Sequence, residues 1–367
     1  MNVDAVLAPA GWPYASSRAG RFHCLFGRDA LITSLQLLPV RPGVAAATLD
    51  ALAARQGVRD DPLTLEEPGK IGHEFRAAPP PSFVEAGWPE GGPFAYYGTA
   101  DATCWYIVLS AAVGRFDAAL DAAAEWLARA LERGDGLVRH RPGEFGLAQQ
   151  GWRDTIDAAG DPNGGGFVRA DGTNPTPPLA DVDTQAVALV ALRALAAHDP
   201  AWARAADALH ARLAALPVDT MALEAGDVRV PGAGSQLGWL LWAGVEGPFA
   251  ERLCEPDILT PYGLRTLSCA DPNFSAHAYH RGSVWPFDSW LGWAGLRRAR
   301  LPAEAERVRR GVLRALDELG QAPELYAVTE AGPKPIASSN WVQAWTIGAR
   351  WALEHQFDPI CPQSPLS

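Results

Sequence analysis

Apolar residues recur at helical spacing along most of the chain, and this pattern predicts the secondary structure. Between residues 117 and 133, Leu120, Leu127 and Leu131 fall on one face of a helix. Pro302 stands where a helix begins, a position at which its missing N–H costs little. The segment 184–197 is apolar almost all round, as in a helix buried on both sides. Ten helices are predicted in all: 29–38, 44–56, 101–113, 117–133, 184–197, 203–216, 236–243, 283–298, one from residue 302, and 339–354.

Little of the chain alternates as a strand would. Short extended pieces are expected only at 136–140 and 227–230, and no βαβ rhythm indicates a parallel sheet. The segments 77–92 and 160–178 are rich in Pro and Gly, and we expect them to be long loops of a kind that often carries function. Paired helices in this number fit an all-α (α/α)6 barrel, or toroid, with long loops. Periodicity alone does not establish that the ring closes.

Composition narrows the range of partners. The net charge is −11, and no Lys/Arg cluster offers a basic face to phosphate, so a nucleic-acid partner is not expected. No apolar run is long enough for a membrane helix. We find no signal peptide and an odd number of scattered cysteines, which favours free thiols in a reducing cytoplasm. These cysteines are Cys24, Cys104, Cys254, Cys269 and Cys361. There are 14 tryptophans, a side chain suited to cover the apolar face of a sugar ring.

Two segments carry the strongest candidates for acid–base chemistry. The first runs Gln150-Gly-Trp152-Arg-Asp154-Thr-Ile-Asp157. An apolar neighbour such as Trp152 raises the pKa of a carboxyl group, which lets it remain protonated near neutral pH. In the second, Glu324 lies between apolar neighbours just after a predicted helix, where the helix dipole disfavours a carboxylate. Such a placement is costly unless a partner or a function compensates.

Further polar and aromatic clusters are weaker candidates for sugar binding. Asp29, beside Arg28, starts a predicted helix and is as well explained as an N-cap. Asp101 stands at the start of another predicted helix, where capping by Thr99 or Asp101 would explain the presence of this acidic residue. The charged segment 66–76 would ordinarily be a solvated loop. The candidate binding residues from all clusters are Arg28, Asp29, Glu67, Asp101, Trp105, Gln150, Trp152, Asp157, His280, Trp285 and Trp341.

Taken in order, these segments resemble the bacterial amylo-α-1,6-glucosidase (glycogen debranching) family and the related mannosylglycerate hydrolase-like enzymes. The matching strings are LFGRDALIT (25–33), EEPGKIGHEFR (66–76), YYGTADAT (96–103), QGWRDTIDA (150–158), TPYGLRTLS (260–268), YHRGSVWP (279–286), PELY (323–326) and QAWTIGA (343–349). They span nearly the whole chain. The resemblance implies an (α/α)6 barrel and an inverting glycoside hydrolase with Asp154 as general acid and Glu324 as general base.

The resemblance leaves the substrate open between an α-glucoside of the amylo-α-1,6-glucosidase type and a small glycosylglycerate. It predicts one catalytic domain over 1–367 without the N-terminal β-rich domain of larger members. No cofactor and no metal site are expected, and the oligomeric state is not indicated. Two other classes stay open. A sugar epimerase would use histidine bases, for which His73, His277 and His280 are candidates, and a non-catalytic sugar-binding protein would use neither carboxylic acid.

Overall fold

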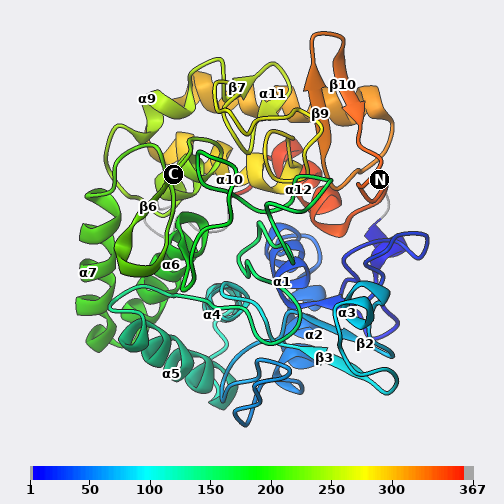
Figure 1. The fold of residues 1–367 in the computed structure, drawn as a ribbon, viewed down its shortest axis with the longest axis vertical. Helices are drawn as coiled ribbons and strands as arrows, with labels where there is room; N and C mark the ends of the chain where they lie inside the picture. The colour runs from blue at the N-terminus through cyan, green and yellow to red at the C-terminus, as the bar shows by residue number, and fades with distance from the viewer. Residues whose placement is uncertain (1–2, 359–367) are drawn as a thin grey trace.

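The computed structural model describes residues 3–358, and helices dominate it. Six helices follow one another around a central axis, each packed against the next, and the last returns to the first (Figure 1). In order around the ring they are α1 (Gly27–Gln36), α4 (Ala102–Ala112), α6 (Val182–His198), α8 (Gln236–Trp242), α10 (Pro286–Arg298) and α12 (Ala344–Glu354). The contact of α1 with α12 joins segments more than 300 residues apart in sequence.

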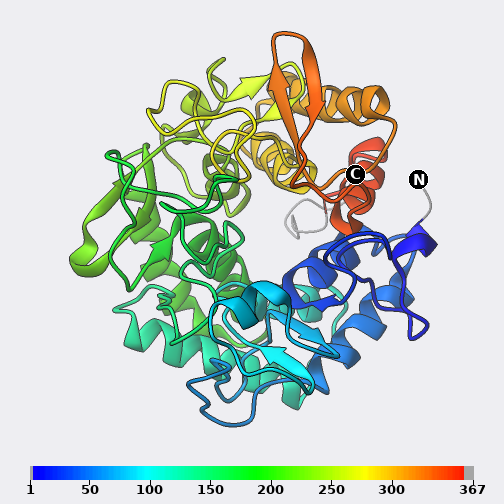
Figure 2. The same ribbon diagram turned by 45° about the vertical axis from the view of Figure 1, so that its right-hand side comes forward.

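A second set of helices lies outside this ring, each against the inner helix that precedes it in the chain. They are α2 (Pro42–Ala53), α5 (Ala118–Arg133), α7 (Ala203–Ala214), α9 (Phe249–Leu253) and α11 (Pro302–Leu319). Figure 2 shows the same arrangement from another side, with the outer helices at the periphery. The remaining helices are short: α3 (Pro81–Glu85), η1 (Val3–Val6), η2 (Pro200–Trp202) and η3 (Ala225–Asp227).

Burial distinguishes the two sets and follows the sequence pattern. Every residue of α1 and of α8 is buried, whereas α5 and α11 bury a single stripe and expose charged residues opposite it. Gly238 in α8 and Gly292 in α10 permit a close approach of these two helices, because a Cβ on Gly238 would lie 2.6 Å from the Gly292 Cα. The ring therefore depends on small residues where two inner helices meet.

Four small antiparallel sheets lie near the starts of inner helices or in the connections between helices. β1 (Leu25–Phe26), β2 (Glu74–Arg76) and β3 (Phe94–Tyr96) form one, and β4 (Ala180–Asp181), β5 (Thr220–Leu223) and β6 (Arg229–Pro231) another. β7 (Leu259–Thr260) pairs with β8 (Gly263–Leu264), and β9 (Tyr326–Thr329) with β10 (Gly332–Pro335). Because β1 and β4 end directly before α1 and α6, the strands help to fix where these helices start.

All ten predicted helices are present, with ends shifted by a few residues. The helix expected from residue 283 begins at Pro286, and the helix expected from 339 begins at Ala344, because the residues before them are extended. The side chain of Asp117 caps α5 by accepting from the N–H groups of Ala119 and Leu120. Of the two expected extended pieces, 227–230 overlaps β6, whereas in 136–140 only His140 forms a bridge, to Leu179.

Three of the alternative local interpretations were wrong. Asp29 lies inside α1 and caps nothing, and Asp101 precedes α4 without a capping hydrogen bond, because both carboxylates bind other side chains. The segment 66–76 is largely buried rather than solvated, since Lys70, His73 and Glu74 are each at most 5% exposed.

Cys24, Cys104, Cys254 and Cys269 are free thiols, and Cys361 lies outside the described residues. Within residues 3–358, no helix is long and apolar enough to cross a membrane.

Candidate active site

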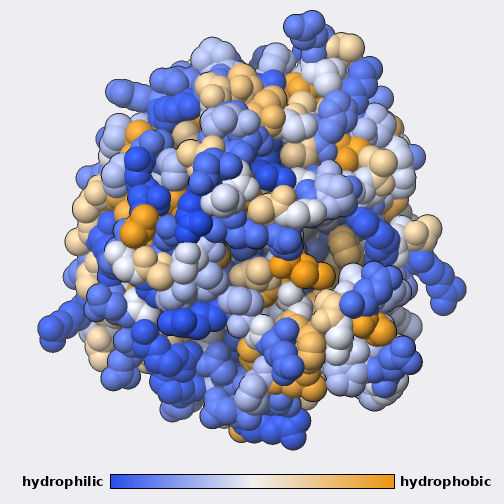
Figure 3. Space-filling model, viewed as in Figure 1, coloured by the Kyte–Doolittle hydropathy of each residue, from blue (hydrophilic) through white to orange (hydrophobic). Residues whose placement is uncertain are grey.

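A cavity of about 930 Å³ opens at the end of the ring where the inner helices begin. Its wall includes residues from the first turns of α1 and α12 and from the loops that precede α4, α6 and α10. The face seen in Figure 3 is hollowed near its centre, with apolar and polar side chains side by side around the hollow. Because N-terminal helix ends carry partial positive charge, this end of the ring suits carboxylate groups and electron-rich ligands.

Asp154 reaches the cavity from the loop before α6 and is held by a buried arginine. Arg28 Nη1 donates to its Oδ2 at 3.0 Å, while the same guanidinium bonds Asp101 through Nε at 2.7 Å and the Gly151 carbonyl through Nη2 at 2.8 Å. Burial raises the pKa of Asp154 to about 6, and the charge of Arg28 opposes this rise. Asp154 keeps 26% of its side chain exposed, so its carboxyl group can meet a ligand and titrates near neutral pH.

Glu324 reaches the same cavity from the segment between α11 and β9. The Tyr279 hydroxyl donates to its Oε1 at 2.7 Å, and the backbone and side-chain N–H groups of Asn340 each donate to Oε2 at 3.2 Å. Burial raises the pKa of Glu324 to about 7, although these donors favour the ionised form. Among residues 3–358 no hydrogen bond joins Glu324 to Asp154, so two separate carboxyl groups face one cavity.

A third carboxyl group, that of Asp29, lies near both. Burial raises its pKa to about 8 against the opposing charge of Arg28. Gln343 Nε2 donates to Asp29 at 3.0 Å, and Asn340 Nδ2 donates to Gln343 Oε1 at 3.3 Å and to Glu324 at 3.2 Å. Two amide side chains thus link Asp29 to Glu324, and the group most readily kept neutral at pH 7 is Asp29.

Aromatic rings form a continuous layer beneath these carboxyl groups. Trp152, Trp285 and Trp345 line the cavity, and the ring of Trp152 lies 5.4 Å from that of Trp285. Behind them the layer continues into the ring core through Trp239 and Phe287, at 6.0 Å and 5.2 Å from Trp152. The three tryptophans are each at most 3% exposed, so they form an apolar base for the polar wall of the cavity.

The structure brings most of the predicted site residues together. The predicted residues that line the cavity are Arg28, Asp29, Trp152, Asp154, Asp157, His280, Trp285 and Glu324. Asp101 stands one step behind, bonded to Arg28 and Thr99. Gln150 is buried and donates to the carbonyl groups of Arg141 and Leu147.

Three other predicted residues do not line the cavity. Glu67 pairs with Lys70 and Arg133 at the outside of the ring. Trp105 is fully buried within α4 against Trp239 and Trp242. Trp341 is 47% exposed and lies next to Asn340, outside the cavity wall.

Several residues in or behind the cavity wall were not among the predicted hydrolase site residues, although His73 was a candidate base for an epimerase. Tyr279 and Asn340 hold Glu324, Gln343 holds Asp29, and His73 and Glu74 form part of the wall. All five lie within or next to the segments singled out above, so their motifs gave a signal, but the direction of each side chain did not follow from it. Within residues 3–358, no cluster of His, Cys, Asp and Glu is arranged to hold a metal ion.

Comparison with known proteins defines the class of this fold and site. Residues 117–332, more than half of the chain, match the model of the mannosylglycerate hydrolase MGH1-like glycoside hydrolase domain. The chain therefore belongs to this family and is a glycoside hydrolase. No curated protein matches the chain.

Solved structures show the same fold at low identity. A GH63 mannosylglycerate hydrolase from Thermus thermophilus in complex with Tris is 16% identical, with a TM-score of 0.66 over 95% of this chain and 98% of that one. The same enzyme in complex with glucose gives 16% identity and a TM-score of 0.64, covering 97% and 98% of the two chains. A wild-type glycosidase is 15% identical, with a TM-score of 0.56 over 96% of this chain and 93% of that one.

Proposed function

We propose that this protein hydrolyses neutral α-glucosides with inversion, using Asp154 as general acid and Glu324 as general base. The observation that carries the proposal is that these two carboxyl groups, 170 residues apart in sequence, face one sugar-sized cavity without bonding each other. Inverting enzymes place two carboxyl groups on opposite sides of the sugar with room for water between them. The six inner and five outer helices are then the body of an (α/α)6 barrel.

The partners of each group support its role. Glu324 accepts three hydrogen bonds, all of which favour the carboxylate that would remove a proton from water. Asp154 is partly exposed to the cavity, and burial raises its pKa to about 6, so part of the population carries a proton for the glycosidic oxygen near neutral pH. Because the pKa of Glu324 is about 7, the form with protonated Asp154 and ionised Glu324 is the less populated of the two singly protonated forms. The nearby carboxyl of Asp29 would stabilise the positive charge that develops on the sugar ring only in its ionised form, and burial favours its neutral form below about pH 8.

The charge of the wall favours a neutral substrate. Acidic residues outnumber arginines among those that line the cavity: Asp29, Glu74, Asp154, Asp157, Asp161 and Glu324 against Arg21, Arg28 and Arg76. Arg28 and Arg76 already pair with carboxylates. The wall also includes the apolar side chains of Leu147 and Ile156. Such a wall suits a neutral glucoside better than an anion.

One residue favours the alternative of a glycosylglycerate. Arg21 lines the cavity and is exposed, and its guanidinium donates to the Ser338 carbonyl rather than to a carboxylate. It could therefore receive the carboxylate of such a substrate, and the similar structures named above include a mannosylglycerate hydrolase.

A product assay separates these possibilities. The wild type is incubated with isomaltose, maltotriose, glucosylglycerate and mannosylglycerate, and the released hexose is measured. Faster turnover of a neutral glucoside supports the main proposal. Faster turnover of a glycosylglycerate that is lost in Arg21→Gln supports the alternative. Asp154→Asn should abolish turnover of whichever substrate is best, and full activity of that variant would exclude the proposed acid.

A further inference from the structure

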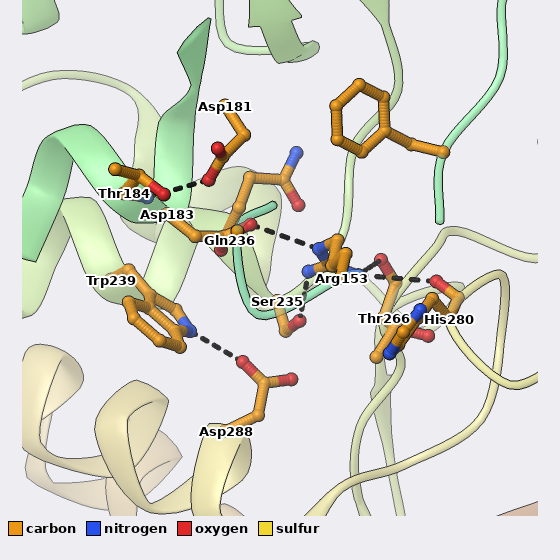
Figure 4. A network of polar contacts seen from close by, with 12 residues as sticks. Arg153, Asp181, Asp183, Thr184, Ser235, Gln236, Trp239, Thr266, His280 and Asp288 are labelled. Atoms are coloured by element: carbon orange, nitrogen blue, oxygen red, sulfur yellow. Dashed lines mark hydrogen bonds and ion pairs between the residues drawn. The ribbon is translucent and has the colours of Figure 1, made fainter. Parts of the chain in front are cut away.

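Arg153 follows Trp152 and precedes Asp154, yet its side chain lies away from the cavity in a buried polar cluster (Figure 4). Only 2% of the side chain is exposed, and four hydrogen bonds use its donors. Nε donates to Asp183 at 3.0 Å, and Nη2 donates to the Ser235 hydroxyl at 2.9 Å. Nη1 donates to two backbone carbonyl groups, that of Thr266 at 3.0 Å and that of His280 at 3.3 Å.

These acceptors belong to separate parts of the ring. Asp183 lies in the first turn of α6, Ser235 directly before α8, and the two carbonyl groups in the loops before α10. The guanidinium carbon also lies 4.3 Å from the centre of the Trp152 ring, which is part of the cavity floor. One side chain therefore joins the loop of Asp154 to three other segments.

One of these segments leads to Glu324. His280 directly follows Tyr279, whose hydroxyl donates to Glu324 at 2.7 Å and whose carbonyl accepts from Trp285 Nε1 at 2.8 Å. The hydrogen bond from Arg153 to the His280 carbonyl thus fixes the backbone next to this tyrosine. We propose that Arg153 is a positioning residue that holds Asp154 at its working place relative to the segment supporting Glu324. This inference rests on the proposed function.

The geometry explains why arginine stands here. A guanidinium presents five donors in a rigid plane, whereas a lysine ammonium is a compact charge with three donors on a flexible stem. Lysine could neutralise Asp183 but could not also reach Ser235 and both carbonyl groups. Asp288, which accepts from Trp239 Nε1 at 2.6 Å, is a second buried carboxyl group near the cluster. Burial raises its pKa to about 6, and the charge of Arg153 opposes the rise.

The test is Arg153→Lys, assayed on two substrates that differ in their need for an acid. Methyl α-glucoside requires protonation of its leaving group, whereas the fluoride of α-glucosyl fluoride leaves without it. Misplacement by about 1 Å can cost about 10²-fold in rate, so kcat on the methyl glucoside should fall about 10- to 100-fold with little change in KM. The loss of kcat on α-glucosyl fluoride should be smaller than the loss on the methyl glucoside by a factor of at least about ten. An equal loss on both substrates, or no loss, would overturn the proposal.

Two further variants separate positioning from stability. Arg169→Lys is the matched control, because Arg169 bonds Glu224, Thr176 and Asn174 but does not line the cavity. It should be as active as wild type on both substrates. The pair Arg153→Met with Asp183→Asn removes both buried charges together. Persistent loss on the methyl glucoside at an unchanged Tm supports positioning, and recovered activity would show that the arginine serves stability alone.

Failure of the proposed function would look different. If the wild type is inactive on methyl α-glucoside and α-glucosyl fluoride, all variants are assayed on methyl α-mannoside and α-mannosyl fluoride instead. Should Asp154→Asn then hydrolyse the methyl glycoside normally, the proposed acid itself is wrong. If Asp154→Asn is inactive and Arg153→Lys is fully active, only the inference about Arg153 is overturned.

Discussion

Replacement of Glu324 by Gln tests the proposed base with the least disturbance of its surroundings. The amide oxygen can take the place of Oε2 and accept from both N–H groups of Asn340, which now donate at 3.2 Å. The amide nitrogen then faces the Tyr279 hydroxyl, which can rotate to accept instead of donate. Every hydrogen bond keeps a partner, so we expect the free energy of unfolding to change by no more than about 1 kcal/mol.

The catalytic cost of Glu324→Gln follows from the lost proton acceptor. An amide cannot take a proton from water, and general base catalysis contributes roughly 10²–10⁴-fold. This corresponds to about 3–5 kcal/mol in the activation free energy. Because the shape of the cavity and its other contacts are retained, KM and the Kd for substrate should stay within about threefold of wild type.

Initial rates on the best glycoside of the panel, with calorimetric binding of the same substrate, measure both effects. Glu330→Gln is the control, since Glu330 is exposed at the turn between β9 and β10. It should match wild type in rate and affinity. A kcat of Glu324→Gln within tenfold of wild type would refute the assignment, and a loss confined to KM would show that Glu324 only binds substrate.

Three further predictions concern pH and packing. The carboxyl groups of Asp154 and Glu324 have pKa values of about 6 and about 7, so a plot of kcat/KM against pH for a glycoside should be bell-shaped with its maximum between these values. For the glycosyl fluoride the decrease of kcat/KM at alkaline pH should vanish, because this substrate needs no general acid. Burial raises the pKa of Asp29 from 3.8 to about 8, so the folded chain retains a proton that the unfolded chain has lost, and stability falls as the pH rises from about 4 to about 8. Asp29→Asn should therefore raise the Tm at pH 8 more than at pH 5, and an equal shift would contradict this. Gly238→Ala should cost about 1–3 kcal/mol by pushing α8 from Gly292, whereas Gly43→Ala, which meets no neighbouring atom, should not destabilise in thermal or denaturant unfolding.

The helices could be predicted from the sequence because the local spacing of apolar residues indicates which faces of each helix are buried. Segments apolar on all sides became inner helices, and segments with one apolar stripe became outer ones. The ring itself could not be predicted in this way, because it depends on contacts such as that of α1 with α12, for which no local pattern exists.

The site was predictable in part for a similar reason. Asp154 and Glu324 were named from their motifs, and both face the cavity. Trp105 lies in an equally suggestive segment, but its position within α4 turns it into the core. Glu67 was expected to bind substrate, but its side chain lies outside the cavity, where it pairs with Lys70 and Arg133. Side-chain direction, which motifs do not encode, decided these cases.

The configuration of the first product tests the central claim most directly. Proton NMR, recorded within the first minutes of α-glycoside hydrolysis by the wild type, distinguishes the two anomers before they interconvert. With Asp154 and Glu324 acting across the sugar on a single water molecule, the β-anomer should appear first. Initial release of the α-anomer would contradict the account.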